Sequence, residues 1–222
     1  MSNIFNLGVQ NSIFNQFISE LRNIDIQTDA MRFRRNMERI GEILAYEISK
    51  TFPYEKQTIT TPLGAVEMHL IKQQPVLATI LRAGLPLHQG LLNYFDKAEN
   101  AFISAFRKHD VEGNFDIQID YMSSPKLKNR ILIIADPMLA TGKSMVLAYR
   151  ALLTMGAPKH VHIVSAIAST DGLEYIQQHI PQNKTTIWVG AIDQELTVQS
   201  YIVPGLGDAG DLAYGLKIDT TK

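Results

Sequence analysis

The stretch from Ile131 to Ser144 constrains the fold most, because it has the pattern of a buried strand, a polar loop and the start of a helix. Residues 131–134 are Ile, Leu, Ile and Ile, a run typical of a strand covered on both faces. The apolar spacing of residues 145–153 predicts a helix. A loop in this position can direct backbone N–H groups and the positive helix end at one phosphate. The alternative is an ordinary turn, in which Gly and Ser are common.

Composition limits the classes of protein to which the chain can belong. The 222 residues are 45% hydrophobic and 19% charged, as in a globular protein with a sizeable core. A net charge of −1 argues against a broad surface for nucleic acid, and the absence of cysteine excludes disulfides and thiolate metal sites. There is no signal-peptide pattern and no apolar run of about 18 residues for a membrane span. We expect a cytoplasmic protein that binds neither nucleic acid nor membranes.

The loop does not match two common nucleotide-binding motifs. Its ending, Gly142-Lys143-Ser144, occurs in nucleoside-triphosphatase loops, but those loops need a glycine at the position of Pro137. Proline also lacks an N–H group that could bind a phosphate. No Gly-x-Gly-x-x-Gly pattern opens a helix, so a dinucleotide fingerprint is excluded as well.

The rest of the chain alternates predicted strands and helices, which favours a parallel sheet covered by helices. Strands are predicted as a pair within residues 57–70 and at residues 76–81, 101–106, 115–121, 161–168 and 186–191. Helical spacing is found around residues 13–21, 31–48 and 172–179, with Thr28 or Asp29 and Thr170 or Asp171 as caps. The apolar stripes of the first 50 residues predict a homodimer or homotetramer.

Three further segments carry polar groups beside predicted strands. Arg82-Ala83-Gly84 follows residues 76–81 and suits an anion, with a structural ion pair as the alternative. The polar residues 108–114 predict a mobile loop that acts as a lid, with a solvated charge cluster as the alternative. Residues 201–211 contain three glycines and two aspartates, so their exposed backbone groups suit the edge of a flat polar ring.

Three segments, at residues 80–84, 133–142 and 201–217, follow one another along the chain and resemble signatures of the uracil phosphoribosyltransferases. Residues 133–142, Ile-Ile-Ala-Asp-Pro-Met-Leu-Ala-Thr-Gly, resemble the family's loop for 5-phosphoribosyl 1-diphosphate. Residues 80–84 resemble its second signature, and residues 201–217 resemble its uracil-binding signature. The sequence departs from the family at Lys143, where a glycine is usual, and at Leu212, where a basic residue is usual. The resemblance covers about residues 17–217.

The resemblance implies a fold and a reaction. The fold is α/β, of the type I phosphoribosyltransferase class: one domain over residues 1–222, with a mostly parallel sheet, helices on both faces, an N-terminal arm of residues 1–27 and a small hood of residues 192–217. The reaction transfers 5-phosphoribosyl from 5-phosphoribosyl 1-diphosphate to uracil, giving UMP and diphosphate. The implied cofactor is Mg²⁺, bound through the diphosphate and not by a dedicated protein site. The alternatives are an RNA-binding regulator of pyrimidine genes, a transferase for another base and a catalytically silent relative. Control by GTP is left open.

The resemblance also assigns roles to individual residues. The implied catalytic residues are Arg82, Arg107, Asp136 and Asp208. Together with these four, the residues that bind 5-phosphoribosyl 1-diphosphate are Pro137, Met138, Leu139, Ala140, Thr141, Gly142, Lys143 and Ser144. The implied uracil-binding residues are Tyr201, Ile202, Gly207, Asp208 and Ala209. For the proton on N1 of uracil, the sequence leaves two alternatives: help from Asp208, or the acidity of uracil itself.

Overall fold

A mostly parallel sheet forms the centre of the protein. The computed structural model describes residues 3–109 and 115–217, with side chains described outside residues 105–118. The strand order is β1-β10-β9-β7-β4-β5-β6, and β8 pairs with β9 beside this path. All neighbours are parallel except β5 and β6. The strands are β1 Ile4–Asn6, β4 Val76–Leu81, β5 Glu99–His109, β6 Phe115–Ser123, β7 Ile131–Ala135, β8 Met138–Leu139, β9 His160–Ser169 and β10 Thr185–Asp193.

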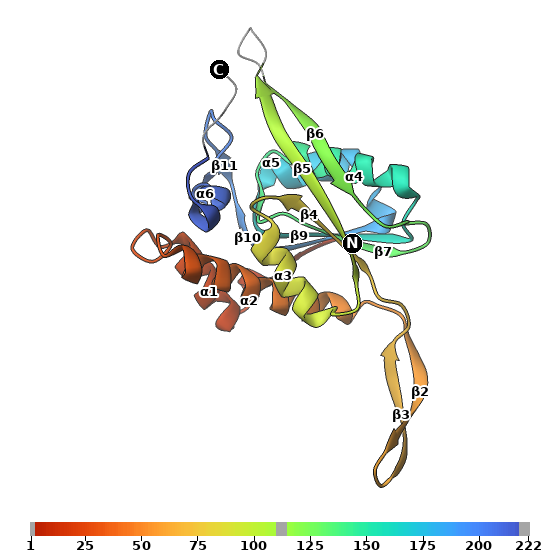
Figure 1. Cartoon of the computed structure of the whole chain (residues 1–222). Coiled ribbons are helices and arrows are strands. Elements are labelled where there is room, and N and C mark those ends of the chain that lie inside the picture. Colours follow the sequence, from red (N-terminus) through yellow and green to blue (C-terminus); the bar gives the residue numbers. More distant parts are fainter. Residues whose placement is uncertain (1–2, 110–114, 218–222) are drawn as a thin grey trace.

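Helices cover both faces of the sheet, which confirms the predicted fold class (Figure 1). On one face lie α1 Ile13–Arg22, α2 Ala30–Ser49 and α3 Leu85–Tyr94, and on the other lie α4 Lys143–Leu152 and α5 Thr170–His179. Alternate residues of β7 serve the two faces: Ile133 packs with the core of the first group, and Leu132 and Ile134 pack with the core of the second. Short 3₁₀ helices lie at Leu7–Val9, Leu153–Met155 and Gln182–Lys184.

The predicted N-terminal arm packs on the body of its own chain. β1 extends the sheet beside β10, and α1 buries Phe14, Ile18 and Leu21. Most of the apolar stripe of α2 also faces inward, since Ile40, Leu44 and Ile48 are buried in the same core. Folding therefore buries most of these two stripes, and the buried residues do not support the prediction of an oligomer. Ile13 and Met31, at their outer ends, stay 64% and 65% exposed.

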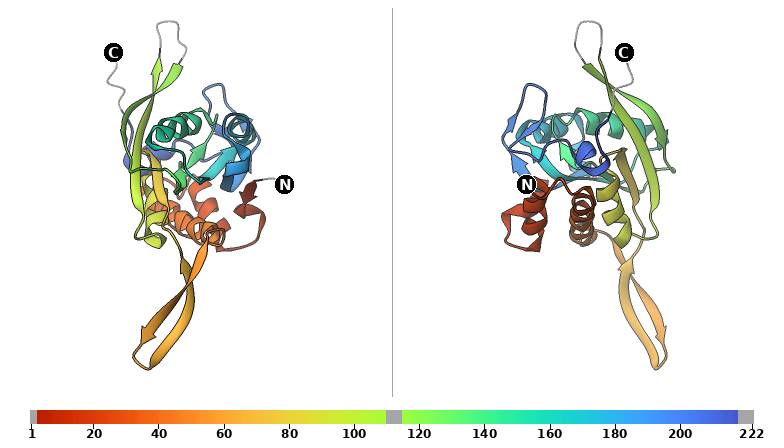
Figure 2. Two further views of the ribbon diagram at one scale, coloured as in Figure 1. Left: turned by 90° about the vertical axis from the view of Figure 1, so that its right-hand side faces the viewer. Right: turned by 60° about the vertical axis from the view of Figure 1, so that its left-hand side comes forward.

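Two hairpins leave the compact body. One consists of β2 Tyr54–Thr61 and β3 Gly64–Ile71, which pair as predicted and project far from the sheet (Figures 1 and 2). The other is formed by β5 and β6, and β5 runs three residues beyond the predicted strand. Residues 108 and 109 of the predicted mobile loop therefore belong to β5, and residues 110–114 lie outside the described residues.

The C-terminal segment forms a small layer beside the carboxyl ends of the strands. It contains the antiparallel pair β11 Glu195–Leu196 and β12 Ile202–Val203, followed by α6 Ala209–Tyr214. In the part of the chain that the structure describes, no helix is long and apolar enough to cross a membrane.

Candidate functional site

The first part of the site is the carboxyl group that follows β7. The backbone N–H of Asp136 donates to the Val164 carbonyl oxygen at 3.0 Å, so the strand pairing continues one residue past the end of β7. This holds the side chain at the edge of the sheet where parallel strands end, the usual place for a ligand in an α/β fold. Burial raises the pKa of Asp136 to about 7, although the backbone N–H of Met138 stabilises its anion.

The loop after Asp136 has the shape expected of a phosphate-binding turn. Gly142 precedes α4 with φ +73°, a left-handed conformation that favours glycine. A Cβ atom there would lie 2.7 Å from the Gly172 carbonyl oxygen of α5, so the close approach of the two helices also requires glycine. The Ser169 hydroxyl donates to the Ala140 carbonyl oxygen at 2.5 Å and fixes the other side of the loop. The backbone N–H groups at the start of α4 are therefore held in a geometry that suits an anion.

The second part of the site is the turn between β12 and α6. Asp208 caps α6, because its Oδ1 accepts hydrogen bonds from the backbone N–H groups of Gly210 and Asp211 at 2.9 and 3.0 Å. Gly207, one residue earlier, has φ +90° and no side chain to cover its peptide groups. The cap fixes the backbone at the start of α6, and at Gly207 no side chain covers that backbone.

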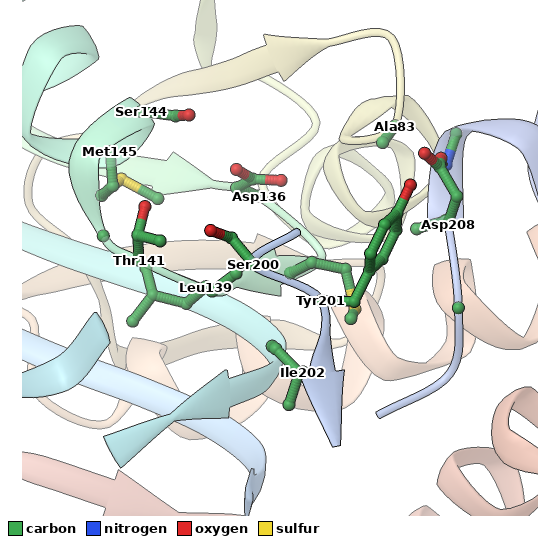
Figure 3. A pocket seen from close by; sticks show the side chains of 16 residues that line it. Ala83, Asp136, Leu139, Thr141, Ser144, Met145, Ser200, Tyr201, Ile202 and Asp208 are labelled. Carbon is green, nitrogen blue, oxygen red and sulfur yellow. The ribbon is translucent and has the colours of Figure 1, made fainter. Parts of the chain in front are cut away.

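These two segments, some 65 residues apart in the sequence, line one cavity of about 160 Å³ (Figure 3). Asp136, Thr141 and Ser144 lie on one side of it, and Tyr201 and Asp208 come from the C-terminal segment. The structure thus brings together a loop that suits a phosphate and a turn that suits a polar ring. The lining residues are Ala83, Asp136, Met138, Leu139, Ala140, Thr141, Gly142, Ser144, Met145, Ser200, Tyr201, Ile202, Gly207, Asp208, Ala209 and Gly210.

Most of the predicted site residues are at this cavity. All five residues assigned to uracil line it, and so do eight of those assigned to 5-phosphoribosyl 1-diphosphate. Pro137 and Lys143 belong to the loop but are not among the lining residues. Arg107 lies in β5, where its backbone pairs with Ile117, and its side chain is outside the described set.

Arg82 is not among the described residues that line the cavity, and its side chain is bound to the C-terminal segment. One terminal nitrogen of its guanidinium donates to Asp211 Oδ1 at 2.8 Å and to the Gly215 carbonyl oxygen at 2.7 Å. The adjacent Ala83 lines the cavity. The Arg82 side chain is 37% exposed, so a ligand can reach it, but any anion must share the guanidinium with the Asp211 carboxylate.

The Asp208 carboxylate is already committed to partners. Burial opposes its ionisation, but the backbone N–H of Asp211 and the ammonium of Lys217 outweigh burial, so the pKa of Asp208 is lowered. Lys217 Nζ lies 3.0 Å from Asp208 Oδ2. At neutral pH this side chain is therefore an anion with both oxygens engaged.

Four lining residues escape the sequence-based assignment: Ala83, Met145, Ser200 and Gly210. Ala83 and Gly210 lie inside the segments 80–84 and 201–217, so their position in these motifs could have identified them as lining residues. Met145 is apolar and belongs to the helical pattern of α4, and that pattern does not distinguish a cavity wall from core. Ser200 has φ +65°, a backbone feature that is invisible in the sequence.

Comparison with known proteins agrees with this geometry. The family model of uracil phosphoribosyltransferase matches residues 9–215. A uracil phosphoribosyltransferase of Porphyromonas gingivalis is 57% identical over 215 residues, covering 97% of this chain and 99% of the relative. That of Methanococcus vannielii is 39% identical over 201 residues, covering 89% and 84%. The solved structure of a protein from Aquifex aeolicus has a TM-score of 0.84 and 30% identity, covering 97% and 99%. The chain therefore belongs to the uracil phosphoribosyltransferase family.

Proposed function

We propose that this protein transfers 5-phosphoribosyl from 5-phosphoribosyl 1-diphosphate to uracil, giving UMP and diphosphate, as in pyrimidine salvage. One observation carries the proposal: Thr141 and Gly207 line the same cavity although they come from different loops. A nucleoside monophosphate has a phosphate at one end and a base at the other, so it needs two such segments facing one space. The family membership of the chain supports the same reaction.

The loop before α4 would bind the sugar phosphate. The 5-phosphate would accept hydrogen bonds from the backbone N–H groups of residues 140–144 and from the hydroxyls of Thr141 and Ser144, next to the positive end of α4. The Asp136 carboxylate would accept from the ribose hydroxyls. This role explains an acid at the base of an anion-binding loop, because the ribose lies between the phosphate and the reacting carbon.

The C-terminal turn would select the base. Uracil presents two carbonyl oxygens and the N3–H, which the backbone groups of Ile202, Gly207 and Ala209 can match. Cytosine carries an amino group at the same edge, and this group would face a backbone donor and leave it unpaired. Tyr201 lines the same cavity and is 45% exposed, so we place it beside the base as a wall.

The reaction needs a stabilised leaving group more than a protein nucleophile. The bond from the anomeric carbon to diphosphate breaks as N1 of uracil bonds to that carbon, and the N1 proton is lost. Arg82 and Arg107 would bind the departing diphosphate. The pKa of Asp208 is lowered and both of its oxygens are engaged, so it is a poor base; the acidity of uracil is the better explanation for proton loss.

Mg²⁺ fits this site as a partner of the substrate. Two carboxyl groups, those of Asp136 and Asp208, line the cavity, and carboxylate oxygens are hard ligands that suit this ion. Among the described residues, no group of three His, Cys, Asp or Glu side chains could hold a metal. We therefore assign most ligands to the diphosphate, with Asp208 orienting the water shell of the ion. The bound ion would supply positive charge to the leaving group.

We also propose that the protein acts as a homodimer or homotetramer. Support comes from the projecting hairpin β2–β3, on which Leu63 is fully exposed and Val66 and Met68 are about half exposed. Apolar groups on a thin projection gain burial only by contact with another molecule. We further propose one domain over residues 1–222, with residues 192–217 as a hood over the site, and a cytoplasmic location.

No observation favours the RNA-binding alternative. Three arginines of α2 make polar contacts with other residues of the same chain. Arg32 pairs with Glu20, Arg35 pairs with Glu38, and Arg34 donates to the Ala213 carbonyl oxygen. These contacts make α2 a packing element and leave less of its charge for a polyanion.

The direct test of the proposed function is diphosphate release from 5-phosphoribosyl 1-diphosphate with uracil, cytosine, orotate, hypoxanthine or no base, with Mg²⁺ present or chelated. We expect release with uracil and Mg²⁺ only. Release with orotate or hypoxanthine would reassign the base. No release with any base would make the protein a silent relative of the enzymes.

A further inference from the structure

We infer that Arg22 and Asp193, which no sequence motif marks, are positioning residues for base selection. With Gly205 they form a cluster that we call the clamp. This inference rests on the proposed function, because it assigns a role in reading uracil to residues outside the cavity. Neither Arg22 nor Asp193 is among the described residues that line the cavity.

The clamp joins elements that are distant in the sequence. Arg22 ends α1, and Asp193 ends β10. The two terminal guanidinium nitrogens of Arg22 donate to the two carboxylate oxygens of Asp193 at 2.8 and 2.9 Å. The Asp193 side chain is 8% exposed and that of Arg22 is 23% exposed. A two-pronged, charge-assisted pair at this depth fixes both side chains in one orientation.

This ion pair forms hydrogen bonds with both backbone polar groups of Gly205. Arg22 donates to the Gly205 carbonyl oxygen at 3.0 Å, and the Gly205 N–H donates to Asp193 Oδ2 at 2.9 Å. Gly205 has φ +55°, and a Cβ atom there would collide with the Ile202 carbonyl oxygen. The turn is thus built for glycine, which is the most flexible residue when it is unrestrained. The clamp supplies the restraint.

Gly205 lies between the backbone groups that would read the base. Ile202 precedes it by three residues, Gly207 follows it by two, and both line the cavity. Leu206 is buried in the core beside it. A shift of the Gly205 peptide would therefore displace the reading groups on both sides. Reading by backbone groups tolerates little displacement, because an ångström of error removes a hydrogen bond.

In the described part of the chain, the clamp is linked to the phosphate loop only through the sheet backbone, where Asp193 pairs with Ser169, whose hydroxyl donates to the Ala140 carbonyl oxygen. Its side-chain hydrogen bonds run to Gly205, and no described one reaches residues 136–144. Loss of the clamp should therefore weaken uracil binding and base discrimination and leave the binding of 5-phosphoribosyl 1-diphosphate unchanged. A general loss of stability would affect both substrates.

The experiment compares R22M and R22K with R32M. Arg32 forms a similar two-pronged pair with Glu20, and neither residue lines the cavity. We expect R22M to raise KM for uracil about 10- to 100-fold, while KM for 5-phosphoribosyl 1-diphosphate stays within about twofold. R22K keeps the charge and should show an intermediate effect. R32M should leave both constants unchanged.

Amide hydrogen exchange provides a second readout that does not depend on turnover. In R22M, the segment 202–209 should exchange faster than in the unsubstituted protein, and in R32M it should not. If R22M changes neither the exchange of this segment nor KM for uracil, the proposed role of the clamp is wrong. It is also wrong if R32M changes both quantities as much as R22M does. If the unsubstituted protein releases no diphosphate with uracil, the proposed function fails, and exchange alone decides whether the clamp holds the turn.

Discussion

The two carboxyl groups in the cavity differ in a way that sets their chemistry. Burial raises the pKa of Asp136 to about 7, whereas hydrogen bonds from Asp211 and Lys217 outweigh burial at Asp208 and lower its pKa. At neutral pH, Asp208 is an anion that shapes the turn. Asp136 changes charge near neutral pH, so its ability to accept hydrogen bonds from ribose depends on pH.

The raised pKa of Asp136 predicts a stability cost above neutral pH. The folded protein holds this proton more tightly than the unfolded chain, whose Asp pKa is near 3.8, so the contribution of Asp136 to stability falls as pH rises from about 4 through 7. With about 1.4 kcal/mol per pKa unit, D136N should stabilise the ligand-free protein at pH 8 by on the order of 2–4 kcal/mol. The gain should vanish near pH 4.

Urea unfolding of both proteins at pH 4, 6 and 8 measures this difference. Equal stability at pH 8 would show that the carboxyl is not desolvated. The same variant should lose turnover about 100-fold, because the amide is a weaker acceptor for the ribose hydroxyls than a carboxylate.

At Arg82, the sequence leaves open a diphosphate ligand or a structural ion pair, and the structure shows an ion pair with Asp211. R82A should lower kcat/KM for 5-phosphoribosyl 1-diphosphate by about 10²- to 10³-fold, because a positive charge at the leaving group is lost. D211N breaks the ion pair but keeps the guanidinium, so it should retain most of the activity. Steady-state kinetics of both variants, with R130A as a remote control, tests this. If D211N lowers kcat/KM as much as R82A does, the role of Arg82 is to form the ion pair and not to bind diphosphate.

At the scale of single elements, the loop before α4 depends on Gly142. In G142A, a left-handed conformation costs about 1–2 kcal/mol, and the new Cβ would crowd the Gly172 carbonyl oxygen of α5. We expect KM for 5-phosphoribosyl 1-diphosphate to rise more than tenfold with KM for uracil unchanged. G64A is the control for backbone strain alone, since Gly64 in the projecting hairpin has φ +158° but nothing lies within 4 Å of a Cβ there. A rise in both constants would mean that the loop is not specific to the sugar phosphate.

The elements that could be predicted are those with a strong local pattern. β4 matches the predicted strand 76–81 at both ends, and Asp29 caps α2 as one of the two residues proposed for that position. α5 begins earlier than predicted, because Ser169 at the end of β9 provides the cap in place of Thr170 or Asp171. β1 was not predicted, since three residues carry too little periodicity. It forms through pairing with β10, where Phe5 stacks on Trp188.

The site could be predicted only where its residues are contiguous. The two loops carry their chemistry in short motifs, and most of the residues named from those motifs line one cavity, with Pro137 and Lys143 as exceptions. The contacts that fix those loops join residues far apart: Arg82 with Asp211, and Arg22 with Asp193 and Gly205. No local pattern encodes such a pair, because either partner alone has the appearance of an ordinary surface charge.

At the scale of the whole molecule, the hairpin β2–β3 should control assembly. Leu63 and Met68 are exposed on it, and replacing them with Ser and Gln removes apolar surface that a second copy would bury. We expect light scattering to show a dimer or tetramer for the unsubstituted protein and the 24.9 kDa monomer for L63S/M68Q. V198S, at another exposed apolar residue, is the control. An unchanged mass in L63S/M68Q would place any interface elsewhere.

We propose that one cavity binds a sugar phosphate with one loop and a pyrimidine with another. Backbone amide NMR shifts during titration with UMP, ribose 5-phosphate and uracil test it most directly. We predict that UMP shifts the amides of both Thr141 and Gly207, that ribose 5-phosphate shifts Thr141, and that uracil shifts Gly207. If UMP shifts only one of the two amides, or neither, the two loops do not bind one ligand and the protein does not form UMP in this cavity.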